Sequence, residues 1–161
     1  MASRLRDYRS SEFEEIWKLD QRCFARDIAY SRQELAHYVS NKNSICLVLD
    51  QEERIIGFIL GHTDRRGFGH IVTLDVDSLQ RRSGLGSRLM GALEERFRAL
   101  GLSSVFLEVA VNNLPALAFY KQHGYSVLKT LRRYYPGGVD GLLMGKRFFE
   151  PSSKSVTDLD R

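Results

Sequence analysis

A short stretch rich in glycine and arginine, QRRSGLGS at residues 80–87, carries the strongest chemical signal in this 161-residue chain. It follows a β-rich run and precedes a helical pattern, so its backbone N–H groups lie at a helix N-terminus, where several lack a helical partner. The partial positive charge there favours an anion, and glycine lets a phosphate approach the backbone closely. The residues that would meet the anion are Arg81, Arg82, Ser83, Gly84, Gly86 and Ser87.

This stretch does not match two well-known phosphate-binding patterns. It lacks the G-K-S/T ending of a Walker loop, and Leu89 stands where the Rossmann fingerprint requires its third glycine. The residues alone therefore leave two interpretations open, a phosphate-binding loop and an ordinary turn between a strand and a helix.

Three side chains in the middle and second half of the chain have types suited to proton transfer. Glu108 is a carboxylate within an apolar run, where a charge needs a partner, water or a shifted pKa. His70 begins the preceding β-rich run and belongs to the residue type that titrates near neutral pH. Tyr120 lies within a helical pattern, where its alternative role is that of a core aromatic. Asp75 is a weaker candidate, and we expect structural or exposed positions for His37, His62 and His123.

The elements that must position these groups alternate between helix and strand. An S-x-x-E capping box at Ser11 and another at Ser31 predict two opening helices. Apolar periodicity and glycine and proline positions define the rest. We expect helices over residues 11–23, 31–39, 84–101 and 115–124, and strands over 45–49, 55–60, 70–76, 105–111, 125–131 and 141–149. This order predicts an α/β (α+β) fold with a β-α-β unit at its centre.

Composition narrows the class of protein further. The chain is 43% hydrophobic and 27% charged with a net charge of +4, which is typical of one globular domain, and we place that domain at residues 1–150. Residues 151–161 are polar without periodicity and predict a flexible tail. No run is long enough for a membrane span, and no secretory signal or zinc spacing is visible. Two cysteines form no disulfide framework, so we expect a cytoplasmic protein without a metal, a membrane or a nucleic-acid partner.

Several motifs resemble the GCN5-related N-acetyltransferase (GNAT) superfamily. The pattern Arg81-x-x-Gly84-x-Gly86 matches the loop that binds the pyrophosphate of acetyl-CoA in that family. LEV, N-x-x-A-x-x-F-Y and GY follow in the family's order at residues 107–125, and RRYY with DGLLM at residues 132–144 is similar to the RimI-type N-terminal acetyltransferases. The resemblance covers residues 4–149. It implies a single-domain GNAT-like fold with six to seven strands in a mixed sheet, an antiparallel N-terminal meander and about four helices.

The resemblance also implies roles for individual residues. Acetyl-CoA is the implied cofactor. Tyr120 would lie at its sulfur and act as general acid, Glu108 would act as general base through a water, and His70 would be auxiliary. The backbone groups of Leu74 and Val76 would pair with the pantetheine arm, in a gap between their strand and that of Glu108. Asn113 would touch the same arm while capping its helix.

The acceptor side is expected at two loops, with contacts from Phe24, Arg26, Tyr30, Tyr134 and Tyr135. An α-amino group, with a pKa of about 8, is neutral far more often at pH 7 than a lysine, at about 10.4. This favours the N-terminus of a protein or peptide as acceptor for an enzyme acting as a monomer or homodimer. Lysine side chains and small amines stay open as acceptors, as does a non-catalytic acyl-CoA sensor. Ala25 and Ala110 depart from residues common in similar enzymes and leave the peptide preference open.

Overall fold

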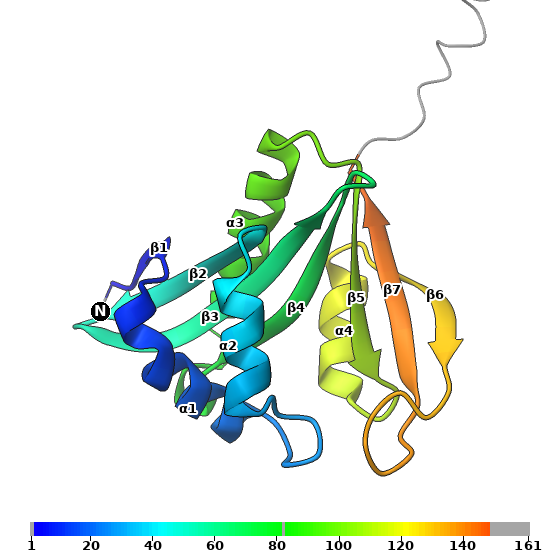
Figure 1. Cartoon of the computed structure of the whole chain (residues 1–161), viewed down its shortest axis with the longest axis horizontal. Coiled ribbons are helices and arrows are strands. Elements are labelled where there is room, and N and C mark those ends of the chain that lie inside the picture. The colour runs from blue at the N-terminus through cyan, green and yellow to red at the C-terminus, as the bar shows by residue number, and fades with distance from the viewer. Residues whose placement is uncertain (1, 82, 149–161) are drawn as a thin grey trace, which may run out of the picture.

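A computed structural model describes residues 2–81 and 83–148, so the expected tail at 151–161 and Arg82 lie outside the described residues. Seven strands form one sheet in the order β1-β2-β3-β4-β5-β7-β6 (Figure 1). The strands are β1 (Arg4–Asp7), β2 (Ser44–Gln51), β3 (Arg54–Asp64), β4 (Phe68–Val76), β5 (Ser104–Ala110), β6 (Ser126–Leu131) and β7 (Gly141–Arg147). The helices are η1 (Ser10–Glu12), α1 (Phe13–Cys23), α2 (Arg32–Ser40), η2 (Ser78–Gln80), α3 (Leu85–Ala99) and α4 (Leu114–Gln122). The mixed sheet, its N-terminal meander and the expected helix content are confirmed.

The sheet has a separate hydrophobic core on each face. Alternation along β2 turns Leu47 and Leu49 toward α3, while Cys46 and Val48 face α1 and α2. Side chains of α4 pack with the α3 core, and Figure 1 shows α1 and α2 together on the opposite face. No helix in residues 2–81 and 83–148 is long and apolar enough to cross a membrane.

Two features near the N-terminus differ from the sequence-based expectation. Strand β1 was not expected, because RLRD shows neither alternation nor β-branched residues. The capping box expected at Ser11 is also wrong. The backbone N–H of Arg9 donates to Glu12 at 2.9 Å, so a short 3₁₀ turn precedes α1.

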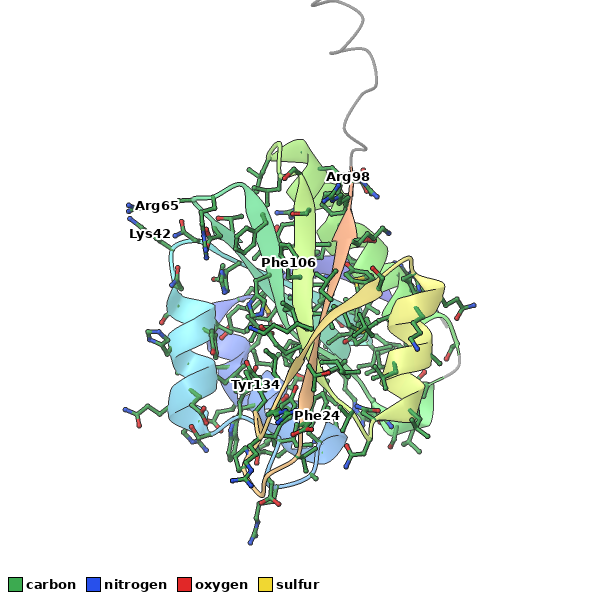
Figure 2. The ribbon with its side chains drawn as sticks, turned by 90° about the vertical axis from the view of Figure 1, so that its right-hand side faces the viewer. Phe24, Lys42, Arg65, Arg98, Phe106 and Tyr134 are labelled. Carbon is green, nitrogen blue, oxygen red and sulfur yellow. The ribbon has the colours of Figure 1, made fainter. Side chains whose placement is uncertain are left out.

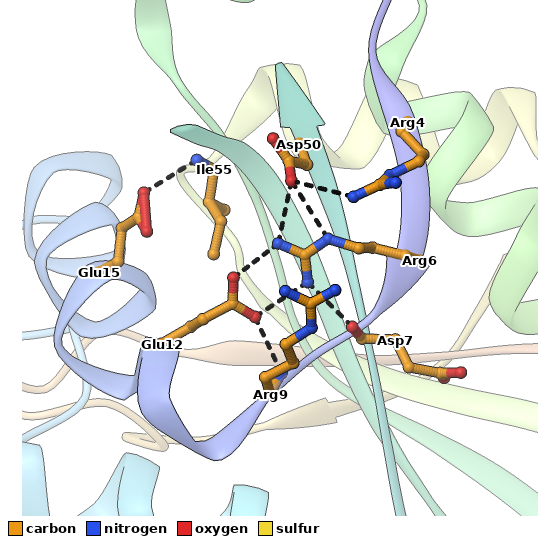
Figure 3. A network of polar contacts seen from close by, with 8 residues as sticks. All are labelled: Arg4, Arg6, Asp7, Arg9, Glu12, Glu15, Asp50 and Ile55. Carbon is orange, nitrogen blue, oxygen red and sulfur yellow. Dashed lines mark hydrogen bonds and ion pairs between the residues drawn. The ribbon is translucent and has the colours of Figure 1, made fainter. Parts of the chain in front are cut away.

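An ion-pair network explains why β1 joins the sheet (Figure 3). The guanidinium of Arg6 donates to both oxygens of Glu12, at 2.9 and 2.6 Å, and to Asp50 on β2 at 3.1 and 3.2 Å. Its side chain is only 14% exposed, so solvent screens these contacts weakly. The hydrogen bond to Arg6 is the largest cause that lowers the pKa of Glu12. The network ties β1, β2 and the turn before α1 together.

Strands β4 and β5 pair in parallel only at their first residues. The pairing runs from Phe68 opposite Ser104 to Ile71 opposite Leu107 and then stops. Strand β4 nevertheless continues to Val76, held on its other side by β3. The two strands therefore part over their second halves, as expected for a gap beside Glu108.

A β-bulge lies where the two strands begin to part. Leu60 of β3 pairs with Thr73 and Gly61 pairs with Ile71, so Val72 is the extra residue. The hydroxyl of Tyr30 donates to the carbonyl oxygen of Val72 at 3.2 Å and satisfies it. The bulge also changes which residues of β4 face α1, because the alternation of side chains shifts by one residue.

One result of this shift is a buried pair of carboxyl groups, Asp20 on α1 and Asp75 on β4. Thr73 donates its hydroxyl to one oxygen of Asp75 at 2.5 Å, and the backbone N–H of Tyr30 donates to one oxygen of Asp20 at 2.9 Å. The second oxygen of each carboxyl is buried and has no other hydrogen-bond partner among the described residues. Burial raises the pKa of Asp75 well above its usual range, and the charge of Asp20 raises it further. Asp75 therefore carries a proton that it donates to Asp20.

This pair gives folding stability a specific pH dependence. An unfolded aspartate loses its proton near pH 3.9, whereas the folded pair, with its raised pKa, keeps one. The stabilisation is therefore complete below about pH 4 and is lost as the pH rises through the folded pKa. In Asp75→Asn, the amide can donate to Asp20 without titrating. The Tm of this variant should therefore rise relative to the Tm of the wild type as the pH increases from 4 to 9.

Thermal unfolding at a series of pH values measures this difference, at about 2–4 °C per kcal/mol for a chain of this size. Glu95→Gln, which removes an exposed carboxylate from α3, should show no such trend. A Tm difference for Asp75→Asn that stays constant with pH, or grows toward acid, would contradict the shared proton.

Candidate active site

A cleft of about 730 Å³ opens where β4 and β5 part. One side is formed by β4, η2 and the start of α3, and the other by the end of β5 and by α4. The segment between α1 and α2 and the β6–β7 loop cover one end. The predicted site residues that line this cleft are Glu108, Tyr120, Leu74, Val76, Arg81, Gly84, Gly86, Ser87, Asn113, Phe24, Tyr30, Tyr134 and Tyr135.

The N-terminus of α3 faces the cleft through its glycine-rich loop. Gly84 is the N-cap and adopts a left-handed conformation with φ of +78°, which glycine adopts without strain. A Cβ at this position would meet no atom within 4 Å, so the approach to the free N–H groups of α3 is open. This geometry fits a phosphate group. Ser83 does not line the cleft, since its hydroxyl donates to the carbonyl of Gln80.

The edge of β4 that faces the gap offers backbone groups to a ligand. Asp77 donates its N–H to Ile56 of β3, so alternation turns the N–H and C=O groups of Leu74 and Val76 away from β3. The carbonyl of Val76 accepts contacts from the side chains of Arg81 at 3.3 Å and Cys23 at 3.4 Å. Leu74 therefore offers the less occupied backbone for pairing with an extended arm.

Helix α4 brings two predicted residues to the opposite side of the cleft. Asn113 caps the helix by accepting the N–H of Ala116 at 3.3 Å, as expected. Tyr120 packs against Tyr125 with ring centroids 5.9 Å apart. Burial raises the pKa of Tyr120. The hydroxyl of Tyr120 therefore stays protonated at neutral pH and is able to donate a proton.

Glu108 points into the cleft from β5 and has a histidine partner. Its Oε2 lies 2.6 Å from Nε2 of His70, and both side chains are 22% exposed. His70 does not line the cleft itself, so its contact with the site runs through Glu108. Nδ1 of His70 in turn lies 3.1 Å from Nε2 of His62 on β3. His62, for which we expected a structural or exposed position, belongs to this row.

At the covered end of the cleft, the residues predicted to contact the acceptor differ in exposure and in whether their polar groups already have a partner. Figure 2 shows Phe24 and Tyr134 at the same end of the molecule, from two loops far apart in sequence. Tyr134 is 51% exposed and packs edge-on against Tyr135, with ring centroids 5.0 Å apart. Tyr30 lines the cleft, but its hydroxyl is held by Val72, so only its ring is available. Arg26 is exposed and does not line the cleft.

Other lining residues were not singled out by sequence reasoning. Glu34, Asp27 and Tyr38 face the same end, and Cys23 lies beside Val76. His62 was the residue with a usable signal, because a hairpin turning at residues 65–67 places residue 62 opposite residue 70, as observed. The others depend on how α1, α2 and the segment between them pack against the sheet, which no period in the sequence reports.

The comparisons with known proteins agree with this fold. Residues 11–125 match the family model described as the acetyltransferase (GNAT) family. An N-acetyltransferase of Methanocaldococcus jannaschii, named as uncharacterized, is 30% identical over 93% of this chain and 94% of its own. An N-alpha-acetyltransferase of Sulfurisphaera tokodaii is 28% identical over 88% and 90% of the two chains. The crystal structure of Ard1 from Thermoplasma volcanium superposes with a TM-score of 0.85 at 26% identity, covering 93% of this chain and all of that one.

The fold, the split sheet and the family match thus define an acyltransferase. The chain belongs to the acetyltransferase (GNAT) family, and its acetyl donor is acetyl-CoA.

The left-handed N-cap gives a direct test of donor binding. In Gly84→Val, a β-branched residue disfavours φ of +78° by about 1–2 kcal/mol, so the loop must leave its open conformation. We expect the Kd of acetyl-CoA, measured by titration calorimetry, to rise on the order of tenfold. Gly91→Val is the matched control, since Gly91 is exposed on α3 and a Cβ there also meets nothing within 4 Å. An unchanged Kd for Gly84→Val would remove this loop from the binding site.

Proposed function

We propose that this protein transfers an acetyl group from acetyl-CoA to the α-amino group of a protein or peptide N-terminus. The observation that supports this most directly is that Glu108 and Tyr120 line one cleft, together with the N-terminus of α3. The relative from Sulfurisphaera tokodaii carries the same activity in its name. In this proposal the acetyltransferase domain spans residues 1–150, acts in the cytoplasm as a monomer or homodimer, and needs no nucleic acid.

The proposed binding arrangement follows the two sides of the cleft. The N-terminus of α3, with Gly84, Gly86 and Ser87, would hold the diphosphate, assisted by Arg81. The backbone of Leu74 would pair with the extended pantetheine arm, as an added strand does at a sheet edge. The donor supplies an acetyl group activated as a thioester. Holding it beside the acceptor amine replaces a bimolecular encounter with an oriented one.

The proposed chemistry requires one proton to leave the amine and one to reach the sulfur. Glu108, directly or through a water, would take a proton from the amine as its nitrogen attacks the acetyl carbon. Tyr120 would donate its hydroxyl proton to the leaving thiolate and regain one from solvent. Its raised pKa keeps that proton in place until the C–S bond breaks. Both groups lie on the side of the cleft formed by β5 and α4, facing the strand edge of β4 along which the thioester would be held.

The geometry of the covered end favours a peptide over a small amine. Tyr134 and Tyr135 come from the β6–β7 loop, and Phe24 and Tyr30 come from the segment between α1 and α2. Together they present aromatic rings on two sides, which suits a first side chain and its backbone. An α-amino group also needs less help from the base, because its pKa of about 8 is far below that of lysine.

Kinetics separate the two proton-transfer roles. Tyr120→Phe should lower kcat by about 10²–10³, the range of general acid catalysis, while the Kd of acetyl-CoA changes less than about twofold. Glu108→Gln should shift or abolish the basic limb of the pH profile of acceptor turnover. Tyr8→Phe, at a half-buried tyrosine that does not line the cleft, is the matched control. Unchanged kcat in Tyr120→Phe would remove this residue as the acid.

The acceptor class is tested by competition. The wild-type protein is given acetyl-CoA together with peptides bearing free N-termini, the same peptides with blocked N-termini and internal lysines, and a pool of polyamines and amino sugars. Thiol release and product masses are followed together. Acetyl on the free N-termini is the expected result and also gives the preferred first residues. Acetyl confined to lysines or small amines would overturn the proposed acceptor, and acetyl-CoA binding without any product would overturn the proposed enzyme activity.

A further inference from the structure

Three polar side chains form a row across β3, β4 and β5 on the face covered by α1 and α2. Glu108 contacts His70 at 2.6 Å, and His70 contacts His62 at 3.1 Å. The two imidazole rings have centroids 5.0 Å apart and are tilted by 59°. Glu108 lines the cleft, whereas neither histidine does. His62 therefore reaches the site through His70 alone.

The donor and acceptor roles within the row depend on the tautomers of its two histidines. A backbone hydrogen bond to Thr63 is one cause that raises the pKa of His62, which is the effect of a carbonyl that accepts an imidazole N–H. Since Nε2 of His62 faces His70, we assign that N–H to Nδ1. A neutral His62 then presents a lone pair on Nε2. His70 must donate its own Nδ1–H to that lone pair. This leaves Nε2 of His70 facing Glu108 without a proton of its own.

The contact between His70 and Glu108 then needs one added proton. Nε2 and Oε2 are both acceptors in their basic forms, and two acceptors 2.6 Å apart require a proton between them. Before that proton arrives, the pair acts as a base, and Nε2 of His70 and Oε2 of Glu108 can share the proton that it accepts. In the other tautomer of His70, Nε2 would already carry a proton and donate it to Glu108. The tautomer therefore decides whether His70 takes part in accepting a proton.

Burial and the neighbouring His70 keep His62 in the neutral form. Burial is the largest cause that lowers the pKa of His62, and the neighbouring His70 lowers it further. Asp64 on the same strand and Glu108 on β5 oppose this without reversing it. On β2, the residue opposite His62 is Ser44, which carries no charge.

We propose that His62 is a positioning residue of the acetyl-transfer site, which holds His70 in the tautomer that lets His70 and Glu108 share the proton taken from the acceptor amine. The inference rests on the proposed function. In the step, the N–H bond of the amine breaks, and its nitrogen keeps the electron pair and bonds to the acetyl carbon. The proton passes to Glu108 and is shared with Nε2 of His70. It then leaves to solvent, which restores the base.

The test compares two substitutions at His62 with a matched control. His62→Leu removes the acceptor for Nδ1–H of His70, while His62→Gln keeps an acceptor oxygen within reach. His37→Leu removes an exposed histidine from α2 outside the row. For each protein we would measure kcat against pH, the Kd of acetyl-CoA and Tm. The protonation of each His70 nitrogen would be read from ¹⁵N chemical shifts.

We expect His62→Leu to lower kcat at pH 7 at least about tenfold, a part of the 10²–10⁴ that general base catalysis contributes, and to shift its pH profile. Acetyl-CoA binding should stay near the wild-type value. The ¹⁵N spectrum should show His70 moving from the Nδ1–H to the Nε2–H tautomer. His62→Gln should keep most of the activity and the wild-type tautomer, and His37→Leu should match the wild type.

Two results would overturn the inference: the same His70 tautomer in His62→Leu as in the wild type, or a pH profile that does not move. The ¹⁵N measurement needs no turnover, so it decides the role of His62 even if peptide N-termini prove not to be the acceptor. Failure of the proposed function would instead appear in the wild-type competition assay, before any substitution is made.

Discussion

The active-site cleft depends on a parallel strand pair that holds for only four residue pairs and then parts. Strands β4 and β5 share hydrogen bonds up to Ile71 and Leu107, so their first halves set the distance and direction of the second halves. From that junction β4 exposes backbone groups, β5 presents Glu108, and α3 and α4 begin at the far ends of the gap. A sheet paired along its full length would have no room for an extended ligand at this position.

The junction is held open by contacts from the opposite side of β4. The bulge at Val72 is fixed by the hydroxyl of Tyr30, whose backbone N–H donates to Asp20. The backbone carbonyl of Tyr30 accepts from Gln21 at 2.7 Å and from Trp17 at 3.3 Å. Three of these contacts tie Tyr30 to α1, and the fourth joins it to β4 at the place where the sheet splits. The acceptor end and the donor end of the cleft share this anchor.

Much of this arrangement was predictable from the sequence, because it follows local periodicity and local chemistry. The glycine loop before α3 and the cap at Asn113 follow from local patterns, whereas the placement of Glu108 and Tyr120 in one site was implied by the resemblance to the GNAT family. Strand β1 could not be found, since its place in the sheet depends on the ion pairs of Arg6 with distant carboxylates.

The bulge at Val72 could not be predicted from the sequence, for a different reason. Alternation counted from His70 puts Asp75 on the opposite face, and only an inserted residue brings both to the side of α1. The pair of Asp75 with Asp20 and the contact of His70 with Glu108 both depend on long-range register. The alternation of side chains within one strand, with its period of two, does not predict that register between strands.

The buried carboxyl pair also makes folding of this protein a reaction that consumes a proton. At neutral pH the unfolded chain holds Asp20 and Asp75 as two carboxylates, whereas the folded chain takes one proton from the buffer and encloses it between them. Unfolding returns that proton to whatever base the solution provides. The heat of unfolding therefore includes the ionisation heat of the buffer, and it differs between an amine buffer and phosphate at the same pH even though the structure lost is the same.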